Sequence, residues 1–110
     1  MYKILIMIDT PQDAQLFEQS WPEFLHQAET MPGLRRESTS RVSSILFGDS
    51  PTGMIHELFF DTLEDLKAAM ASPQGQATGQ TLQRITDGRM SLLLAQHTED
   101  NLDRIRAHKG

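Results

Sequence analysis

His26 and Glu57 are the two side chains of this chain whose chemistry best suits moving a proton. An unperturbed imidazole titrates near neutral pH, so His26 could serve as a general base. The competing interpretation is an exposed histidine on a polar helix face, beside Glu23 and Glu29. We therefore carry His26 as a candidate catalytic residue with a structural alternative.

Glu57 follows His56 directly, and neighbouring residues in a strand point to opposite faces, so the two cannot share a pocket. Glu57 alternates with Phe59, which places both on the face that we expect a partner subunit to cover. Glu57 is our second catalytic candidate. A structural hydrogen bond to Arg35 or Arg41 is the alternative.

Trp21 offers a flat apolar wall with one hydrogen-bond donor at its edge, which suits an aromatic ligand. It could equally be a core residue beside Pro22. Arg35, Arg36 and Arg41 could hold a carboxylate or a phosphate through paired donors, or form ion pairs with surface carboxylates.

Metal and cofactor motifs are missing from the sequence. The four histidines lack a short ligand spacing, and the chain has no cysteine, so we expect no metal site. Gly75 and Gly79 follow a Ser-Pro break instead of a strand and lack a nearby lysine, which argues against a phosphate loop. No dinucleotide fingerprint is present, and we expect no cofactor.

Composition narrows the class of protein. A chain of 110 residues with 38% hydrophobic and 23% charged residues is typical of one soluble globular domain. A net charge of −5 argues against nucleic acid as a partner, since phosphate backbones need clustered lysine and arginine. The apolar run from Ile4 to Ile8 is too short to span a bilayer and lacks a cleavage signal, so we expect a cytoplasmic protein without a membrane partner.

Periodicity predicts four strands and two helical segments. Apolar spacing of three and four residues between Leu16 and Met31 indicates a helix, with a kink or a restart at Trp21 because of Pro22. Thr62 begins a second helical segment, which Ser72-Pro73 splits and Gly88 ends. The predicted strands are residues 2–9, 34–47, 54–61 and 90–97. Residues 98–110 form a charged C-terminal tail outside the domain of residues 1–97.

This βαββαβ order is that of the ferredoxin-like fold, an α+β architecture with helices on one face of a four-stranded antiparallel sheet. Apolar residues are then left for the other face, and such a face usually marks association. They are Leu5, Met7, Phe59 and some of Leu92, Leu93 and Leu94. Two sheets packed face to face would form a dimeric α+β barrel with a cavity in each subunit.

Several segments resemble the EthD-like family of dimeric α+β barrel proteins, over nearly the whole chain from Tyr2 to about Gln96. They are the aromatic pair Phe17 and Trp21, the stop at residues 31–35, the stretch at residues 57–66, and the Ser-Pro-x-Gly-x-Ala segment at residues 72–77. The resemblance implies a ferredoxin-like homodimer, and the family's founding case is linked to ether degradation. At two positions this chain departs from the family: Leu25 stands where a helix histidine is usual, and Thr81 where an aspartate is common.

We hypothesise a homodimer with a small apolar pocket for a small hydrophobic or aromatic molecule, as a cofactor-free oxidoreductase or proton-transfer enzyme. The candidate binding residues are Phe17, Trp21, Leu25, Arg35, Phe59 and Thr81. The alternative is a non-catalytic binding or accessory protein of the same fold, since the family's polar groups are displaced or absent. A monooxygenase like other dimeric α+β barrels is a third interpretation, without a convincing haem ligand.

Overall fold

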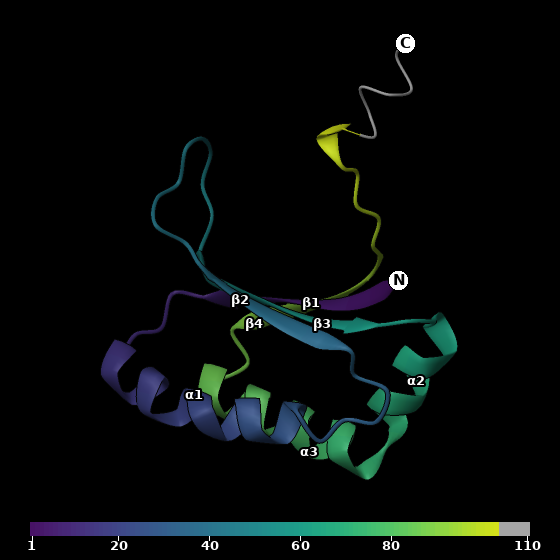
Figure 1. Cartoon of the computed structure of the whole chain (residues 1–110). Coiled ribbons are helices and arrows are strands. Elements are labelled where there is room, and N and C mark those ends of the chain that lie inside the picture. Colours follow the sequence, from purple (N-terminus) through teal and green to yellow (C-terminus); the bar gives the residue numbers. More distant parts are fainter. Residues whose placement is uncertain (104–110) are drawn as a thin grey trace.

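The computed structural model describes residues 1–103, which fold into one sheet and three helices (Figure 1). In chain order the elements are β1 (Tyr2–Asp9), α1 (Ala14–Ala28), β2 (Arg36–Arg41), β3 (Thr52–Phe60), α2 (Leu63–Ala71), α3 (Pro73–Thr86) and β4 (Met90–Gln96). The predicted βαββαβ order is confirmed, with the second helical segment split into α2 and α3. Part of the predicted tail, residues 104–110 with His108, lies outside the described residues.

The sheet is antiparallel throughout, in the order β2-β3-β1-β4. β1 lies inside it and pairs Ile6 with His56 of β3 and with Leu92 of β4. All three helices cover one face of this sheet, which we call the helix face (Figure 1). The other face, the open face, is turned away from them.

The hydrophobic core lies between the helix face and the helices. Alternate residues of β1 and β3 point into it, and α1 adds one apolar stripe at the predicted spacing. The core side chains from these three elements are Ile4, Ile6, Ile8, Met54, Leu58, Phe60, Phe17, Trp21, Phe24 and Ala28. His26 lies on the exposed side of α1, which is the alternative that the sequence left open for it.

Side-chain caps fix where each helix begins. Asp13, Thr62 and Ser72 accept hydrogen bonds from backbone amides three residues further on, at 3.0, 3.1 and 3.0 Å. Each cap satisfies a donor that the first turn leaves without an intrahelical partner. α3 ends where Asp87 and then Gly88 adopt positive φ angles of 54° and 73°.

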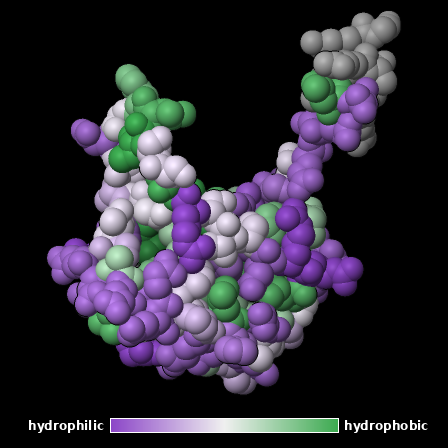
Figure 2. Space-filling view, turned by 60° about the vertical axis from the view of Figure 1, so that its left-hand side comes forward, coloured by the Kyte–Doolittle hydropathy of each residue, from purple (hydrophilic) through white to green (hydrophobic). Residues whose placement is uncertain are grey.

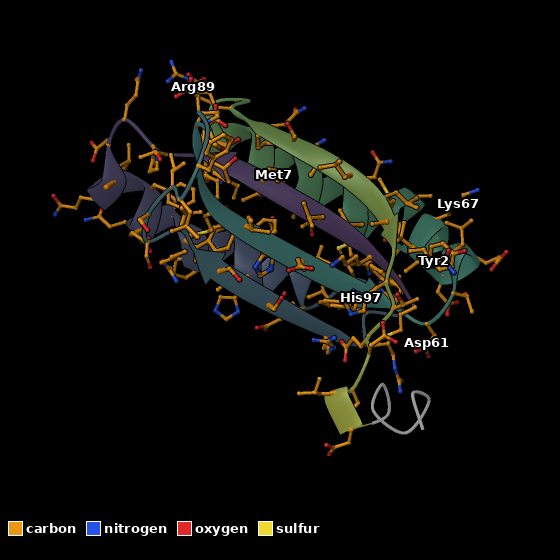
Figure 3. All side chains as sticks on the ribbon, turned by 90° about the horizontal axis from the view of Figure 1, so that it is seen from above. Tyr2, Met7, Asp61, Lys67, Arg89 and His97 are labelled. Atoms are coloured by element: carbon orange, nitrogen blue, oxygen red, sulfur yellow. The ribbon has the colours of Figure 1, made fainter. Side chains whose placement is uncertain are left out.

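The open face carries the residues of β1 and β3 that lie between those of the core (Figure 3). Leu5, Met7 and Ile55 are half-buried there, and Leu93 of β4 is 47% exposed. The sequence left open which β4 leucines join them. The register places Leu93 on the open face, and Leu92 and Leu94 on the helix face.

Two sequence predictions need correction. β2 ends at Arg41 instead of Phe47, because the pairing with β3 stops after the hydrogen bond from Val42 N to the Gly53 carbonyl. Residues 42–51 form a protruding loop that we call the arm (Figure 1). Leu46 and Phe47, predicted as strand residues, are 96% and 99% exposed at its tip. α1 continues through Pro22 as one helix, so there is no restart at Trp21.

Within residues 1–103, no helix has both the length and the apolar character needed to cross a bilayer.

Candidate functional site

An apolar hollow of about 80 Å³ lies between the helix face and helices α2 and α3. Its walls come from β1, β3 and β4 below and from all three helices above. The lining residues are Ile4, Ile6, Phe24, Met31, Leu58, Met70, Gly75, Thr78, Gly79, Leu82 and Leu92. Met70 and Leu92 are 44% and 48% exposed, so the hollow meets solvent at the β4 edge of the sheet.

Thr78 brings the only side-chain oxygen to this lining. Its hydroxyl already donates to the carbonyl of Gln74, four residues earlier in α3, at 2.7 Å. A ligand that needed hydrogen bonds would therefore find few free partners among the lining side chains. The hollow suits an apolar molecule.

The two glycines of the lining have different roles. A Cβ at Gly75 would lie 2.0 Å from the carbonyl oxygen of Ala69, so this glycine is required by the close approach of α2 and α3. A Cβ at Gly79 would meet nothing within 4 Å. Packing does not demand glycine at position 79, and a larger residue there would take up space beside the hollow.

His56 is fully buried next to the hollow, behind Phe24. The edge of its ring meets Trp21 and Phe24, with ring centroids 5.2 and 5.4 Å away. Its Nδ1 lies 2.8 Å from Thr39 Oγ1, and its Nε2 lies 3.3 Å from Glu37 Oε2. Both ring nitrogens thus have partners on β2.

Burial sets the charge state of this cluster. Desolvation lowers the pKa of His56 to about 4, against a smaller opposing effect of Glu57, so the imidazole is neutral at neutral pH. Burial also raises the pKa of Glu37, with a further contribution from Glu29. A neutral imidazole that donates from Nε2 to Glu37 and accepts at Nδ1 from Thr39 satisfies all three groups. His56 is a poor base in this state.

Glu57 lies on the open face, as predicted, but its partner is different from the one expected. Its carboxylate pairs with Lys3 at 2.5 Å, whereas Arg35 pairs with Asp61 and Arg41 with Glu18. The reason is register: Lys3 sits on the neighbouring strand β1, on the same face and within reach.

Phe59 also lies on the open face and is only 2% exposed. The guanidinium of Arg36 lies 3.8 Å from its ring centroid, and the centroid of the His97 ring lies 4.9 Å away. Glu99 holds both of these groups, at 2.8 Å each. Phe59 is thus covered by charged and polar side chains of its own chain.

The predicted site residues therefore divide between two sides of the sheet. Phe17, Trp21 and Thr81 are buried on the helix side, where Leu25 is half-buried against the core. Glu57 and Phe59 lie on the open face. His26 and Arg35 are exposed. Within one protomer the sheet separates His26 from Glu57.

Sequence reasoning missed Glu37 and Thr39 as neighbours of His56. Glu37 and Thr39 are two residues apart in β2, so their side chains point to the same face. Only the pairing of β2 with β3 shows that His56 lies beside them on that face. Among residues 1–103, no group of three or more histidine, aspartate or glutamate side chains is arranged to hold a metal ion.

A second, larger hollow of about 410 Å³ lies where β1 ends, between the start of α1 and the end of α3. It is lined by side chains of both charges, among them Asp9, Asp13 and Arg89. Arg84 at its rim is paired with Glu23 at 2.7 Å. This mixture does not select a ligand class.

Solved structures share this fold. An EthD family protein from Bacillus halodurans C-125 superposes with a TM-score of 0.83 at 23% identity, over 89% of this chain and 99% of that one. A dimeric ferredoxin-like protein of unknown function from Jannaschia sp. CCS1 gives 0.66 at 13%, over 87% and 98%. SnoaB, a cofactor-independent oxygenase from Streptomyces nogalater, gives 0.66 at 12%, over 90% and 94%.

No family model and no curated protein matches the sequence. The resemblance to EthD-like proteins inferred from the sequence is confirmed by the structural likeness, which at these identities shows the fold alone.

Proposed function

We propose that this protein is a homodimer in which each protomer binds one small hydrophobic or aromatic molecule in the apolar hollow. The observation that carries this proposal is the lining of the hollow, whose one side-chain hydroxyl is already hydrogen-bonded within α3. Binding an apolar molecule there removes its surface from water and leaves no polar group of the lining side chains without a partner.

The size of the hollow limits the ligand. At about 80 Å³ the hollow itself suits a short branched chain, and a single ring, which fills a cavity of about 150 Å³, must extend into the open mouth. Met31 and Met70 are in its wall, and unbranched methionine side chains adapt to irregular ligands more easily than other apolar residues do. A somewhat larger molecule could enter if Met70 turns outward.

The open face supports the dimer. Leu5, Met7, Ile55 and Leu93 form an apolar area that the helices of the same chain leave uncovered. Packing two such faces would cover both, as the fold of a dimeric ferredoxin-like neighbour suggests by analogy.

Binding without turnover accounts best for the polar groups near the hollow. His56 has both ring nitrogens occupied and a pKa of about 4, so it offers little basicity at neutral pH. His26 is exposed, and Glu57 lies on the opposite side of the sheet. Proton-transfer or cofactor-free oxygenase chemistry would require one of these groups to reach the ligand.

The test is binding of toluene, followed by chemical-shift changes in the amides of residues around the hollow. Gly79→Leu should weaken binding by at least ~10-fold, because the new side chain occupies space beside the hollow. Ala68→Leu is the matched control, since position 68 is exposed on α2 and does not line the hollow. Sedimentation of the unmodified chain at micromolar concentration should give a dimer.

Equal affinity of the unmodified chain and Gly79→Leu would place the ligand elsewhere. A monomer in the sedimentation experiment would refute the dimer and leave the hollow to be judged by the binding data alone.

A further inference from the structure

The arm, residues 42–51, ends in an apolar tip that the rest of residues 1–103 leaves exposed (Figure 2). Ile45, Leu46 and Phe47 are 51%, 96% and 99% exposed. Three consecutive apolar side chains at the end of a protruding loop are costly to leave in water, at about 25 cal/mol for each Å² of apolar surface. Such a tip is expected to pack against another surface.

The arm rises from the sheet on the side away from the helices (Figure 1). A second copy packed on the open face would lie on the same side. The arm has about five residues on each leg, so it can reach roughly 16 Å at 3.3 Å per residue. Face-to-face sheets are only about 10 Å apart. The tip therefore passes the partner's sheet and arrives at the partner's helix layer.

The choice of edge depends on the orientation of the two-fold axis between the sheets. β2 and β4 are the two edge strands. An axis parallel to the strands sets β2 of one protomer across from β4 of its partner, whereas a perpendicular axis sets β2 across from β2. The arm follows β2, so these arrangements bring its tip to different edges of the partner.

β4 is the edge that matches the tip in polarity. Leu92 and Leu94 point to the helix face but are 48% and 51% exposed, because the helices leave this edge partly uncovered. β2 has the sequence RESTSR and offers no apolar residue. The base of the arm and the start of β4 also lie at the same end of the sheet. Ile8 of β1 pairs there with Met54, beside the arm, and with Met90 of β4.

We propose that the arm tip of one protomer packs against Leu92 and Leu94 of the partner subunit and closes the mouth of the partner's hollow. The mouth lies between Leu92 and Met70, at the β4 edge. Each ligand site is then completed by residues 45–47 of the other copy. This inference rests on the dimer and the hollow proposed above.

The chain has no cysteine, so engineered pairs can be cross-linked without background. Leu46→Cys combined with Leu92→Cys should give a covalent dimer under mild oxidation. Leu46→Cys combined with Arg36→Cys is the matched control, because position 36 lies on β2 at the far end from the arm. A covalent dimer of the control at an equal or faster rate would overturn the proposal.

A second variant tests the effect on ligand binding. The double variant Leu46→Ser with Phe47→Ser should raise the Kd for toluene at least ~10-fold and weaken the dimer. Its circular dichroism spectrum should stay unchanged. Leu16→Ser is the control, since Leu16 is 59% exposed but lies on α1, at the larger hollow.

The outcomes separate this inference from the proposed function. A monomeric or non-binding unmodified chain would refute both. An unmodified chain that dimerises and binds toluene, with tip variants that behave identically, would overturn the role of the arm and leave the proposed function standing.

Discussion

The two faces of the sheet are built from the same strands but differ in how much of their apolar surface is buried. On the helix face, Ile4, Ile6 and Ile8 are at most 6% exposed, whereas Leu5 and Met7 between them are only half-buried. Along β1 the helix face is covered by helices of the same chain, and only its β4 edge stays open. The open face keeps apolar surface that residues 1–103 leave partly exposed, and we therefore place the proposed dimer interface there.

Polar groups show the same contrast. His56 is enclosed on the helix face, where its hydrogen bonds to Glu37 and Thr39 replace water. On the open face, Lys3 and Glu57 keep 15% and 19% of their side-chain surface exposed. In the proposed dimer, a charged pair on this face adds little to affinity but restricts which partner fits.

The largest expected effect comes from truncating an aromatic residue on the helix face. Phe24→Ala should lower the free energy of unfolding by about 3–5 kcal/mol, because it leaves a cavity between α1, the hollow and His56. Met7→Ala on the open face should lower the free energy of unfolding of the monomer by about 1 kcal/mol or less. Urea denaturation at low protein concentration measures both.

Raising the protein concentration sharpens this contrast. The cost of Met7→Ala should grow as the dimer forms, since the side chain is then fully buried, whereas that of Phe24→Ala should stay constant. Equal, concentration-independent costs would show that the open face is not an association surface.

The next effect is a pH dependence that belongs to the helix face alone. The pKa of His56 falls from 6.5 to about 4 on folding, so the unfolded chain binds more protons between these values. Stability should therefore be full above about pH 6.5 and decline by about 3 kcal/mol as the pH falls toward 4. Glu37, whose pKa is raised, opposes part of this loss.

His56→Gln keeps a hydrogen-bonding side chain but cannot titrate, so it should flatten the profile between pH 4 and 6.5 while lowering overall stability. Denaturation at several pH values gives the comparison. An unchanged slope in this variant would assign the acid sensitivity to other groups.

The smallest effect concerns the cover over Phe59. Arg36→Ala removes a guanidinium that lies 3.8 Å from the ring centroid. It should lower the free energy of unfolding by about 0.5–1 kcal/mol. Arg35→Ala is the control, because Arg35 is exposed and its ion pair with Asp61 is long, at 3.5 Å. Thermal unfolding should separate the two, and a larger loss for Arg35→Ala would contradict this account of the open face.

Much of the fold follows from local patterns. The helical stripe from Phe17 to Ala28, the cap at Thr62 and the break at Ser72 are each decided by residues close in sequence. The alternation in β3 also separates His56 from Glu57 without any knowledge of neighbours. These features were predictable because their causes lie within a few residues.

The candidate site was less predictable because its contacts join distant segments. Lys3 and Glu57 are 54 positions apart in the sequence, and His56 and Glu37 are 19 positions apart. The end of β2 at Arg41 depended likewise on whether a second strand could pair with residues 42–47. Spacing in one segment cannot reveal a partner in another when the register is unknown.

The sequence by itself determined the order of strands and helices, the apolar face of each and the phase that leaves His26 outside. Those depend on backbone periods of two and 3.6 residues, which any segment carries alone. Only the tertiary structure decided which polar groups meet, where the hollow lies and how far the arm stands from the sheet. These depend on how strands pair and helices pack, where each contact is set by all of the others.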